Sequence, residues 1–259
     1  PYIVPVVVHI IHDGGTENIL DAQILAAIDH LNEGFAAQGY YAQQGAMINT
    51  QIQFCLAKRD PDGNATTGIT RTQSPLTNMI METEDIPTKD LSRWNPKDYV
   101  NIWVVKEISS LSLGAGVAGY AYFPSSHGGP EDGMICEARF FGKSPADDAV
   151  LIHEMGHYFG LYHTFEGGCQ NNDCSINGDR VCDTPPDNAT HTGCNYNSCS
   201  TDVVVGSPFI SDVDDYTNDF MDYSPLSCYA IFTAGQSTRM QAAIEIARKS
   251  LLNSKGCLD

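Results

Sequence analysis

The first hydrophobic pattern in the chain is a continuous, largely β-branched run, YIVPVVVHII, at residues 2–11. Such a run is typical of a strand buried on both faces. From Asp21 to about Gln38 the apolar residues recur at helical spacing, which predicts an amphipathic helix. Shorter apolar runs predict further strands at residues 52–57, 99–105, 120–123 and 133–137, the last two forming a hairpin. The N-terminal part is therefore expected to form a mixed, twisted sheet.

The remaining segments show weaker or different patterns. Residues 64–95 have little periodicity, which favours loops with short helical turns. A helix is expected from about Ser144, where the Ser144 side chain can cap the first amides and Pro145 suits the first turn. Residues 167–225 are rich in Cys, Asp, Asn, Gly and Pro, so cross-links or ions must replace a regular core there. A last helix is predicted at about residues 233–252, with a packing face formed by Met240, Ile244, Ala247 and Leu251.

Composition narrows the class of protein. The 259 residues are 42% hydrophobic and 18% charged, which suits one large domain or two small lobes around a proper core. There is no apolar run of about 18 residues, so no membrane span is expected. The 14 basic against 32 acidic residues give a formal charge of −18, which excludes a nucleic-acid partner because phosphate binding needs a basic surface. The chain begins with Pro1 and has no visible leader, so we expect a mature product from which targeting and inhibitory segments were removed.

The nine cysteines indicate the compartment. Their spacings are irregular and include no zinc-ribbon pair, so we expect disulfides formed in an oxidising compartment and a secreted protein. An odd number leaves at least one thiol unpaired or bonded to another chain. The nine are Cys55, Cys136, Cys169, Cys174, Cys182, Cys194, Cys199, Cys228 and Cys257.

The stretch LIHEMGHYFGLYH carries the most specific chemistry. His153 and His157 are four residues apart, so on a helix both imidazoles can reach one metal ion. Glu154 points to the side, where it can deprotonate a water molecule. Gly160 permits a sharp turn that returns His163 as a third ligand. The pattern H-E-x-x-H-x-x-G-x-x-H leaves a fourth position open and predicts a catalytic zinc site rather than a core helix with buried histidines.

Further along the chain, the sequence FMDY at residues 220–223 completes a resemblance to a known group. A long zinc motif followed by a methionine-containing turn resembles the metzincin metallopeptidases. Within that group, GDRVCDTP at 178–185, NDFMDYS at 218–224 and FTAGQ at 232–236 are similar to the pappalysin family. The resemblance extends over nearly the whole chain.

The resemblance implies an α+β fold with two lobes of one catalytic domain. The upper lobe, residues 1–163, would hold a mixed five-stranded twisted sheet and two helices, including the zinc-binding helix. The lower lobe, residues 164–259, would be irregular and disulfide-rich, would contain the methionine turn and would end in a C-terminal helix. The active-site cleft would lie between them.

The resemblance also implies roles for single residues. His153, His157 and His163 would bind zinc, and Glu154 would act as general base and acid. Met221 would form the hydrophobic floor beneath the metal. Tyr223 would stabilise the oxyanion of the tetrahedral intermediate or cap the metal in the free enzyme, because a phenol can donate a hydrogen bond. An exposed edge strand containing Tyr120, Ala121 and Tyr122 would pair with an extended substrate.

Relatives also bind calcium after the third histidine. Oxygen donors in this segment are Asp179, Asp183 and Thr184, with Glu166 as a further candidate; the alternative is that these acids cap turns.

Family pairings imply the disulfides Cys174–Cys199 and Cys194–Cys228, and Cys169 and Cys182, which are extra to that pattern, can pair with each other. A fourth bond, Cys55–Cys257, would tie the last helix to the upper sheet and leave Cys136 free.

One departure from the family concerns specificity. Members that cleave before arginine carry an acidic residue five positions after the turn methionine, where this chain has Leu226. An arginine buried against Leu226 would lack its countercharge, at a cost of several kcal/mol, on the order given for unpaired buried charges. We therefore predict a preference for apolar side chains after the scissile bond, unless another acid such as Asp222 reaches the pocket.

The predicted function is a secreted, monomeric zinc endopeptidase that acts on proteins or peptides, with Glu154 as the general base. Three alternatives remain. An astacin-like or matrixin-like metzincin is disfavoured by the dipeptide at 164–165 and by the cysteine pattern. A catalytically silent binding module is disfavoured by the presence of Glu154. A structural zinc site is disfavoured by the open fourth position.

Overall fold

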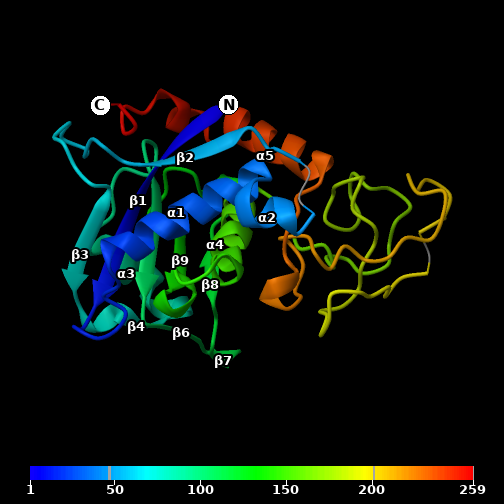
Figure 1. The fold of residues 1–259 in the computed structure, drawn as a ribbon, viewed down its shortest axis with the longest axis horizontal. Helices are drawn as coiled ribbons and strands as arrows, with labels where there is room; N and C mark the ends of the chain where they lie inside the picture. The colour runs from blue at the N-terminus through cyan, green and yellow to red at the C-terminus, as the bar shows by residue number, and fades with distance from the viewer. Residues whose placement is uncertain (46–47, 201, 259) are drawn as a thin grey trace.

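The computed structural model describes residues 1–45, 48–200 and 202–258 (Figure 1). Its main sheet has six strands, namely β1 (Tyr2–His12), β2 (Ile52–Leu56), β3 (Ile69–Gln73), β5 (Val100–Val105), β8 (Gly119–Ala121) and β9 (Met134–Glu137). The path β2-β1-β5-β9-β8 confirms the mixed five-stranded sheet, and β3 adds a sixth strand beside the second half of β1. All pairings along it are parallel except β8–β9, which is the predicted hairpin.

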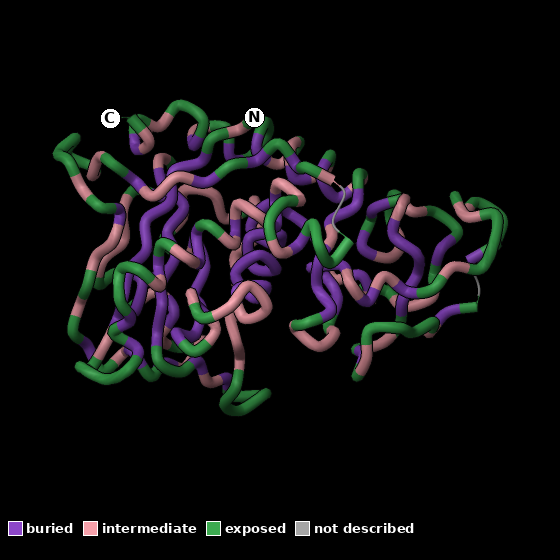
Figure 2. The backbone as a smooth tube through the Cα atoms, in the orientation of Figure 1, coloured by how far each residue is buried: buried purple, intermediate pink, exposed green. Residues whose placement is uncertain are grey.

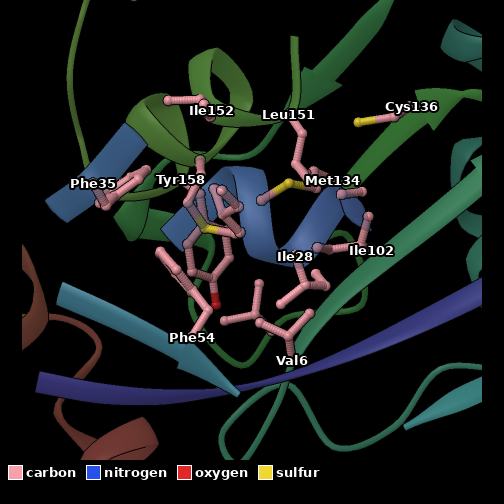
Figure 3. Close-up of a cluster of buried hydrophobic side chains, with 14 of the residues drawn as sticks. Val6, Ile28, Phe35, Phe54, Ile102, Met134, Cys136, Leu151, Ile152 and Tyr158 are labelled. Carbon is pink, nitrogen blue, oxygen red and sulfur yellow. The ribbon is translucent and has the colours of Figure 1, made fainter. Parts of the chain in front are cut away.

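Both faces of β1 are covered, as its apolar run predicts. The alternating residues Val4, Val6, Val8 and Ile10 face a core formed with helices α1 (Asp21–Ala36) and α4 (Pro145–Tyr158), seen in Figure 3. Ile11 belongs to a second, smaller apolar cluster together with Trp103 of β5. The centre of the sheet is therefore a buried layer, and α4 packs against it with every residue from Asp148 to Tyr158 buried (Figure 2).

The segment with little periodicity is more regular than expected. Besides β3 it contains η1 (Pro75–Thr77), β4 (Asn78–Ile80) and the ten-residue helix α3 (Met81–Asp90). The helix has no apolar stripe because the residues it buries are polar: Asp85, Thr88 and Lys89. The Lys89 ammonium lies 2.8 Å from the Asp85 carboxylate and 4.2 Å from the centre of the Tyr122 ring, so charge pairing and a cation–π contact replace apolar packing.

Shorter elements complete the upper lobe. A small sheet is formed by β4 with β6 (Glu107–Ser110) and β7 (Gly114–Ala115). The remaining short helices of this lobe are α2 (Gly39–Gln43), η2 (Pro124–Ser126) and η3 (Ala138–Phe140), whereas η4 (Leu226–Cys228) belongs to the lower lobe. No helix in the described ranges is long and apolar enough to cross a membrane.

The last helix is shorter than expected. It runs as α5 (Ala234–Ile246), and η5 (Lys249–Asn253) follows. Thr233 caps it, since its hydroxyl accepts the Gln236 amide at 3.1 Å. Ala247, expected on the packing face, is exposed because the chain leaves the helix there and turns Arg248 into the core, where its side chain hydrogen-bonds the Tyr158 carbonyl.

Residues 164–232, the part of the lower lobe that precedes α5, are irregular and cross-linked and lie at the right of Figure 1. Two predicted disulfides are confirmed, Cys55–Cys257 and Cys194–Cys228, and Cys136 is a buried free thiol. The predictions Cys174–Cys199 and Cys169–Cys182 are wrong, because the structure joins Cys169 to Cys199 and Cys174 to Cys182. Cys174 and Cys182 flank one tight loop with their Cα atoms 5.0 Å apart, a distance that suits a local bridge.

Candidate active site

Different local features determine where α4 begins and where it ends. At its start the Ser144 hydroxyl accepts the Asp147 amide at 3.2 Å, and Pro145 occupies the first turn, as expected. At its end Gly160 adopts φ = +92°, a left-handed conformation that side chains with a Cβ rarely take. The helix therefore presents His153 and His157 one turn apart, and the chain then reverses beneath them.

The reversal brings the third histidine to the first two. The Nε2 atom of His163 lies 3.2 Å from Nε2 of His153 and 3.0 Å from Nε2 of His157. The Phe165 ring stacks on the His163 ring with 4.8 Å between centroids, which fixes its orientation. The three nitrogens thus converge on one point, as the motif predicts.

The protonation of these histidines suits a metal. Nδ1 of His153 faces the Phe220 carbonyl at 2.5 Å and Nδ1 of His157 faces the Leu161 carbonyl at 2.8 Å, so both rings carry their proton there and keep the Nε2 lone pair free. Burial lowers the pKa of all three imidazoles, that of His163 to about 3. Three neutral nitrogen donors with an open side fit a divalent ion of the zinc type.

Glu154 lies beside the three nitrogens in the wall of the cleft. Burial raises the pKa of its carboxyl to about 8. Gly119 of β8 makes room for it, because a Cβ there would approach the Glu154 Cγ to 3.1 Å. The glycine-rich link that contains Gly119 gave no sign of this role in the sequence.

The methionine turn closes the site from below. Met221 is fully buried, and its sulfur occupies the space that a Cβ on Gly156 of α4 would need. Its carbonyl accepts the Thr164 amide at 3.2 Å, next to His163. The turn is held by Asp219, whose carboxylate accepts the Met221 amide at 2.8 Å and the Gln236 side chain at 3.0 Å. Sequence reasoning missed Asp219, since only the fold brings it to α5.

Tyr223 lies at the mouth of the site. Its ring is 4.6 Å from the His163 ring and 5.6 Å from the His153 ring, and the side chain is about half exposed. It lines both cavities that adjoin Glu154, which brings it together with the metal ligands as predicted.

The two cavities have different walls. One, of about 380 Å³, is mainly apolar and includes Leu113, Val117, Val150, Leu226 and Tyr229. The other, of about 390 Å³, is lined by Glu154, His157, His163 and Tyr223 together with Tyr120, Ala121, Phe123, Tyr162 and Glu166. In the described part of the chain β8 pairs only with β9, so its second edge is free along this cleft.

Not every residue predicted to touch substrate faces the cleft. The Tyr122 ring packs on Lys89 instead, and its carbonyl accepts the Arg248 guanidinium at 3.1 Å. Asp222 is fully buried, and its carboxylate accepts the hydroxyls of Ser224 and Thr164. Asp222 therefore supplies no charge to the apolar cavity.

The residues predicted to bind calcium do not form one group. Asp183 accepts the Thr233 hydroxyl at 2.7 Å and the Gly235 amide at 2.8 Å, so it caps α5, which was the alternative role. Asp179 accepts the Thr184 hydroxyl at 2.8 Å, and Glu166 lies in the cleft. Within the described residues, their carboxylates are not among the clusters close enough to share an ion.

A three-histidine site with an adjacent glutamate, set in a cleft beside a free sheet edge, defines a metal-dependent peptidase. The model of the family described as pregnancy-associated plasma protein-A matches residues 84–245, so the chain belongs to this family, the pappalysins, and is a metalloendopeptidase.

Similar proteins agree with this assignment. An extracellular metalloprotease of Sordaria macrospora is 29% identical over 233 residues, which cover 84% of this chain and 70% of the relative. An extracellular metalloprotease of Arthroderma otae is 27% identical over 253 residues, which cover 93% of this chain and 77% of the relative. The solved structure of mature mirolysin from Tannerella forsythia, in complex with a cleaved peptide, has a TM-score of 0.75 and 29% identity, and covers 96% of this chain and 95% of that one.

Proposed function

We propose that this chain is a secreted zinc endopeptidase that uses Glu154 as general base and prefers apolar side chains after the scissile bond. One observation carries the first part. Nε2 of His163 lies 3.2 Å from Nε2 of His153 and 3.0 Å from Nε2 of His157, and the buried Glu154 lines the cleft beside these neutral histidines. Secretion is supported by the four disulfides and by the relatives named extracellular. A monomeric state stays a prediction.

Zinc held by His153, His157 and His163 would supply a Lewis acid that polarises the scissile carbonyl and makes water a stronger acid. The residues of the chain perform the other steps. The free edge of β8 pairs with the extended substrate and places its scissile bond beside Glu154. Glu154 takes the proton of the attacking water and passes it to the leaving nitrogen, and burial favours this uptake by raising the carboxyl pKa. The Tyr223 hydroxyl donates a hydrogen bond to the developing oxyanion.

The specificity proposal depends on the apolar cavity. Apart from Glu154 beside the metal ligands, its lining contains no carboxylate, and Leu226 stands at the position implied for the pocket base. The nearby acid Asp222 is buried and hydrogen-bonded elsewhere. An arginine side chain in this cavity would therefore lose its hydration without gaining a countercharge.

A proteome-derived peptide library tests both parts. Cleavage should stop on chelation and return with zinc, and the residue after the cut should be Leu, Ile, Val, Met or Phe in most products. Cleavage that continues in the metal-free protein would contradict the catalytic proposal, whereas a profile dominated by arginine would contradict only the specificity proposal.

We also propose a calcium site that uses Asp179 and Thr184 but not Asp183. Burial raises the pKa of the Asp179 carboxyl to about 7, and its Oδ2 atom is buried without a hydrogen-bond partner, which favours a cation there. Added calcium should raise the melting temperature of the protein but not of Asp179→Asn, as scanning calorimetry would measure. An equal rise in both proteins would contradict the site.

A further inference from the structure

A second group of metal-ligating side chains lies in the lower lobe, away from the three catalytic histidines. Asp187 and His191 are four residues apart in the chain, Asp215 lies on a later segment, and all three side chains are buried. Nε2 of His191 lies 3.1 Å from Oδ2 of Asp187 and 3.5 Å from Oδ2 of Asp215. Apart from the catalytic histidines, it is the only such cluster in the described ranges of the chain.

The charges in this cluster do not balance. A third buried carboxylate, that of Asp222, has Oδ1 at 3.9 Å from the same His191 nitrogen. In the part of the chain that the structure describes, His191 is the only basic partner of these three carboxylates. Three acids around one imidazole leave net negative charge in a poorly solvated place, which a bound cation would neutralise.

The spacing of the donors suits a metal ion. A tetrahedral ion with bonds of about 2.1 Å separates its ligand atoms by about 3.4 Å. The separations of 3.1 and 3.5 Å from the His191 nitrogen to the two carboxylate oxygens bracket this value. They are also close to the 3.0 and 3.2 Å between the nitrogens of the catalytic site.

The two oxygens of the Asp215 carboxylate differ in their hydrogen bonding. Oδ2 accepts the Ser198 amide at 2.7 Å, whereas Oδ1 is buried and has no hydrogen-bond partner. Burial raises the pKa of the Asp215 carboxyl, because the protein offers its charge too little compensation. The His191 imidazole makes its ion pairs through Nε2, and its Nδ1 is buried without a hydrogen-bond partner. The Tyr196 ring packs against the face of the imidazole.

We propose that Asp187, His191 and Asp215 bind a second divalent cation of the zinc type. One imidazole nitrogen with carboxylate oxygens suits zinc better than calcium, which prefers oxygen donors alone. The ion would be structural, and Asp222, with Oδ1 3.9 Å from the His191 nitrogen, would add a further negative charge nearby. The ion would hold the methionine turn to the segment 187–191, whose His191 amide already donates to the Tyr223 carbonyl at 2.8 Å.

Zinc binding can be tested without measuring activity. The double variant His153→Ala/His157→Ala removes the catalytic site, and we expect it to bind one equivalent of zinc by calorimetry and by elemental analysis after dialysis. Adding Asp215→Asn should abolish this binding. Adding Asp214→Asn, a neighbouring exposed carboxylate, should leave it unchanged.

Two results would overturn the proposal. One is a folded double variant, judged by circular dichroism, that binds no zinc. The other is binding that survives both Asp215→Asn and His191→Gln. If the variants with added substitutions fail to fold, the unaltered protein still tests the proposal. It should take up two equivalents of zinc, and an uptake of one would refute the second site.

Discussion

At the scale of single residues, the proposed chemistry depends most on the environment of Glu154. Its carboxylate is buried between the metal ligands and β8, with a pKa raised to about 8. Because the side chain is not a ligand, Glu154→Gln should keep the metal and lower kcat/KM by about 10²–10⁴-fold, the usual size of a general-base effect. Peptide kinetics together with zinc content measure both quantities. Activity within a few-fold of the unaltered enzyme would show that another group takes the proton.

Leu226 is the residue on which the specificity proposal depends most directly. Leu226→Asp places a carboxylate in the wall of the apolar cavity, so peptides with arginine after the cut should gain at least about tenfold, or about 1.4 kcal/mol, relative to those with leucine. Competing arginine and leucine peptides give this ratio. The matched control is Leu226→Asn, which is similar in size but uncharged and should not favour arginine. If both variants favoured arginine equally, polarity rather than charge would determine the preference.

The local motif predicted which residues meet at the candidate site because its spacing and its chemistry act within a few turns of chain. His153, His157 and Glu154 belong to one helix, and Gly160 accounts for His163. Asp219 and the cluster around His191 could not be predicted in this way, since their partners lie on segments that only the fold brings together. The same reason explains the exchanged disulfide partners, because any of four nearby cysteines satisfies the sequence pattern.

At the scale of elements, the turn after α4 controls how well the third ligand is placed. Gly160→Ala keeps the histidines but opposes φ = +92°, which costs about 1–2 kcal/mol of strain, and its Cβ would lie 3.3 Å from Pro124. We expect a zinc affinity about tenfold lower in a chelator competition. Gly193→Ala, where nothing lies within 4 Å of the added carbon, is the control and should leave affinity unchanged. Equal affinities in all three proteins would mean that the turn relaxes without moving His163.

Elements that bury an apolar face could be predicted from the sequence, whereas elements that bury polar or charged side chains could not. The strand β1 and the helix α1 bury apolar faces and were predicted nearly to the residue. The helix α3 was missed because it buries a charged pair, and a polar inner face has no hydrophobic period. The end of α5 was placed too late because Arg248, an ordinary helix residue in sequence terms, is drawn into a buried ion pair.

At the scale of the whole molecule, that ion pair joins the C-terminal segment to the sheet. Arg248 and Asp132 are fully buried at 2.8 Å, and the guanidinium also covers the Tyr158 ring. Burial by itself would raise the pKa of Asp132, but the hydrogen bond from His127 and the charge of Arg248 hold it below its ordinary value.

The pair predicts a pH-dependent stability. Asp132→Asn leaves a buried arginine unpaired and should lower the free energy of unfolding by about 3–5 kcal/mol at pH 7. Because the folded pKa is depressed, the carboxylate contributes fully above the unfolded pKa of about 3.9, and the difference from the variant should shrink as pH falls below it. Urea titrations at several pH values measure this. Asp90→Asn, in the exposed pair with Arg93, should change stability by no more than about 1 kcal/mol, and an equal loss in both variants would refute the role of burial.

The cross-linked lobe also determines when in the life of the chain the metal can be captured. His153 and His157 lie on α4, which contains no cysteine and packs against the core of the main sheet. His163 is instead held by a lobe that contains three of the four disulfides and almost no regular structure. In a chain kept reduced, His153 and His157 would thus be held in position, whereas His163 would be mobile. With the proposed secretion, thiol oxidation would be a condition for metal binding, and the protease would become active only outside the reducing interior of the cell.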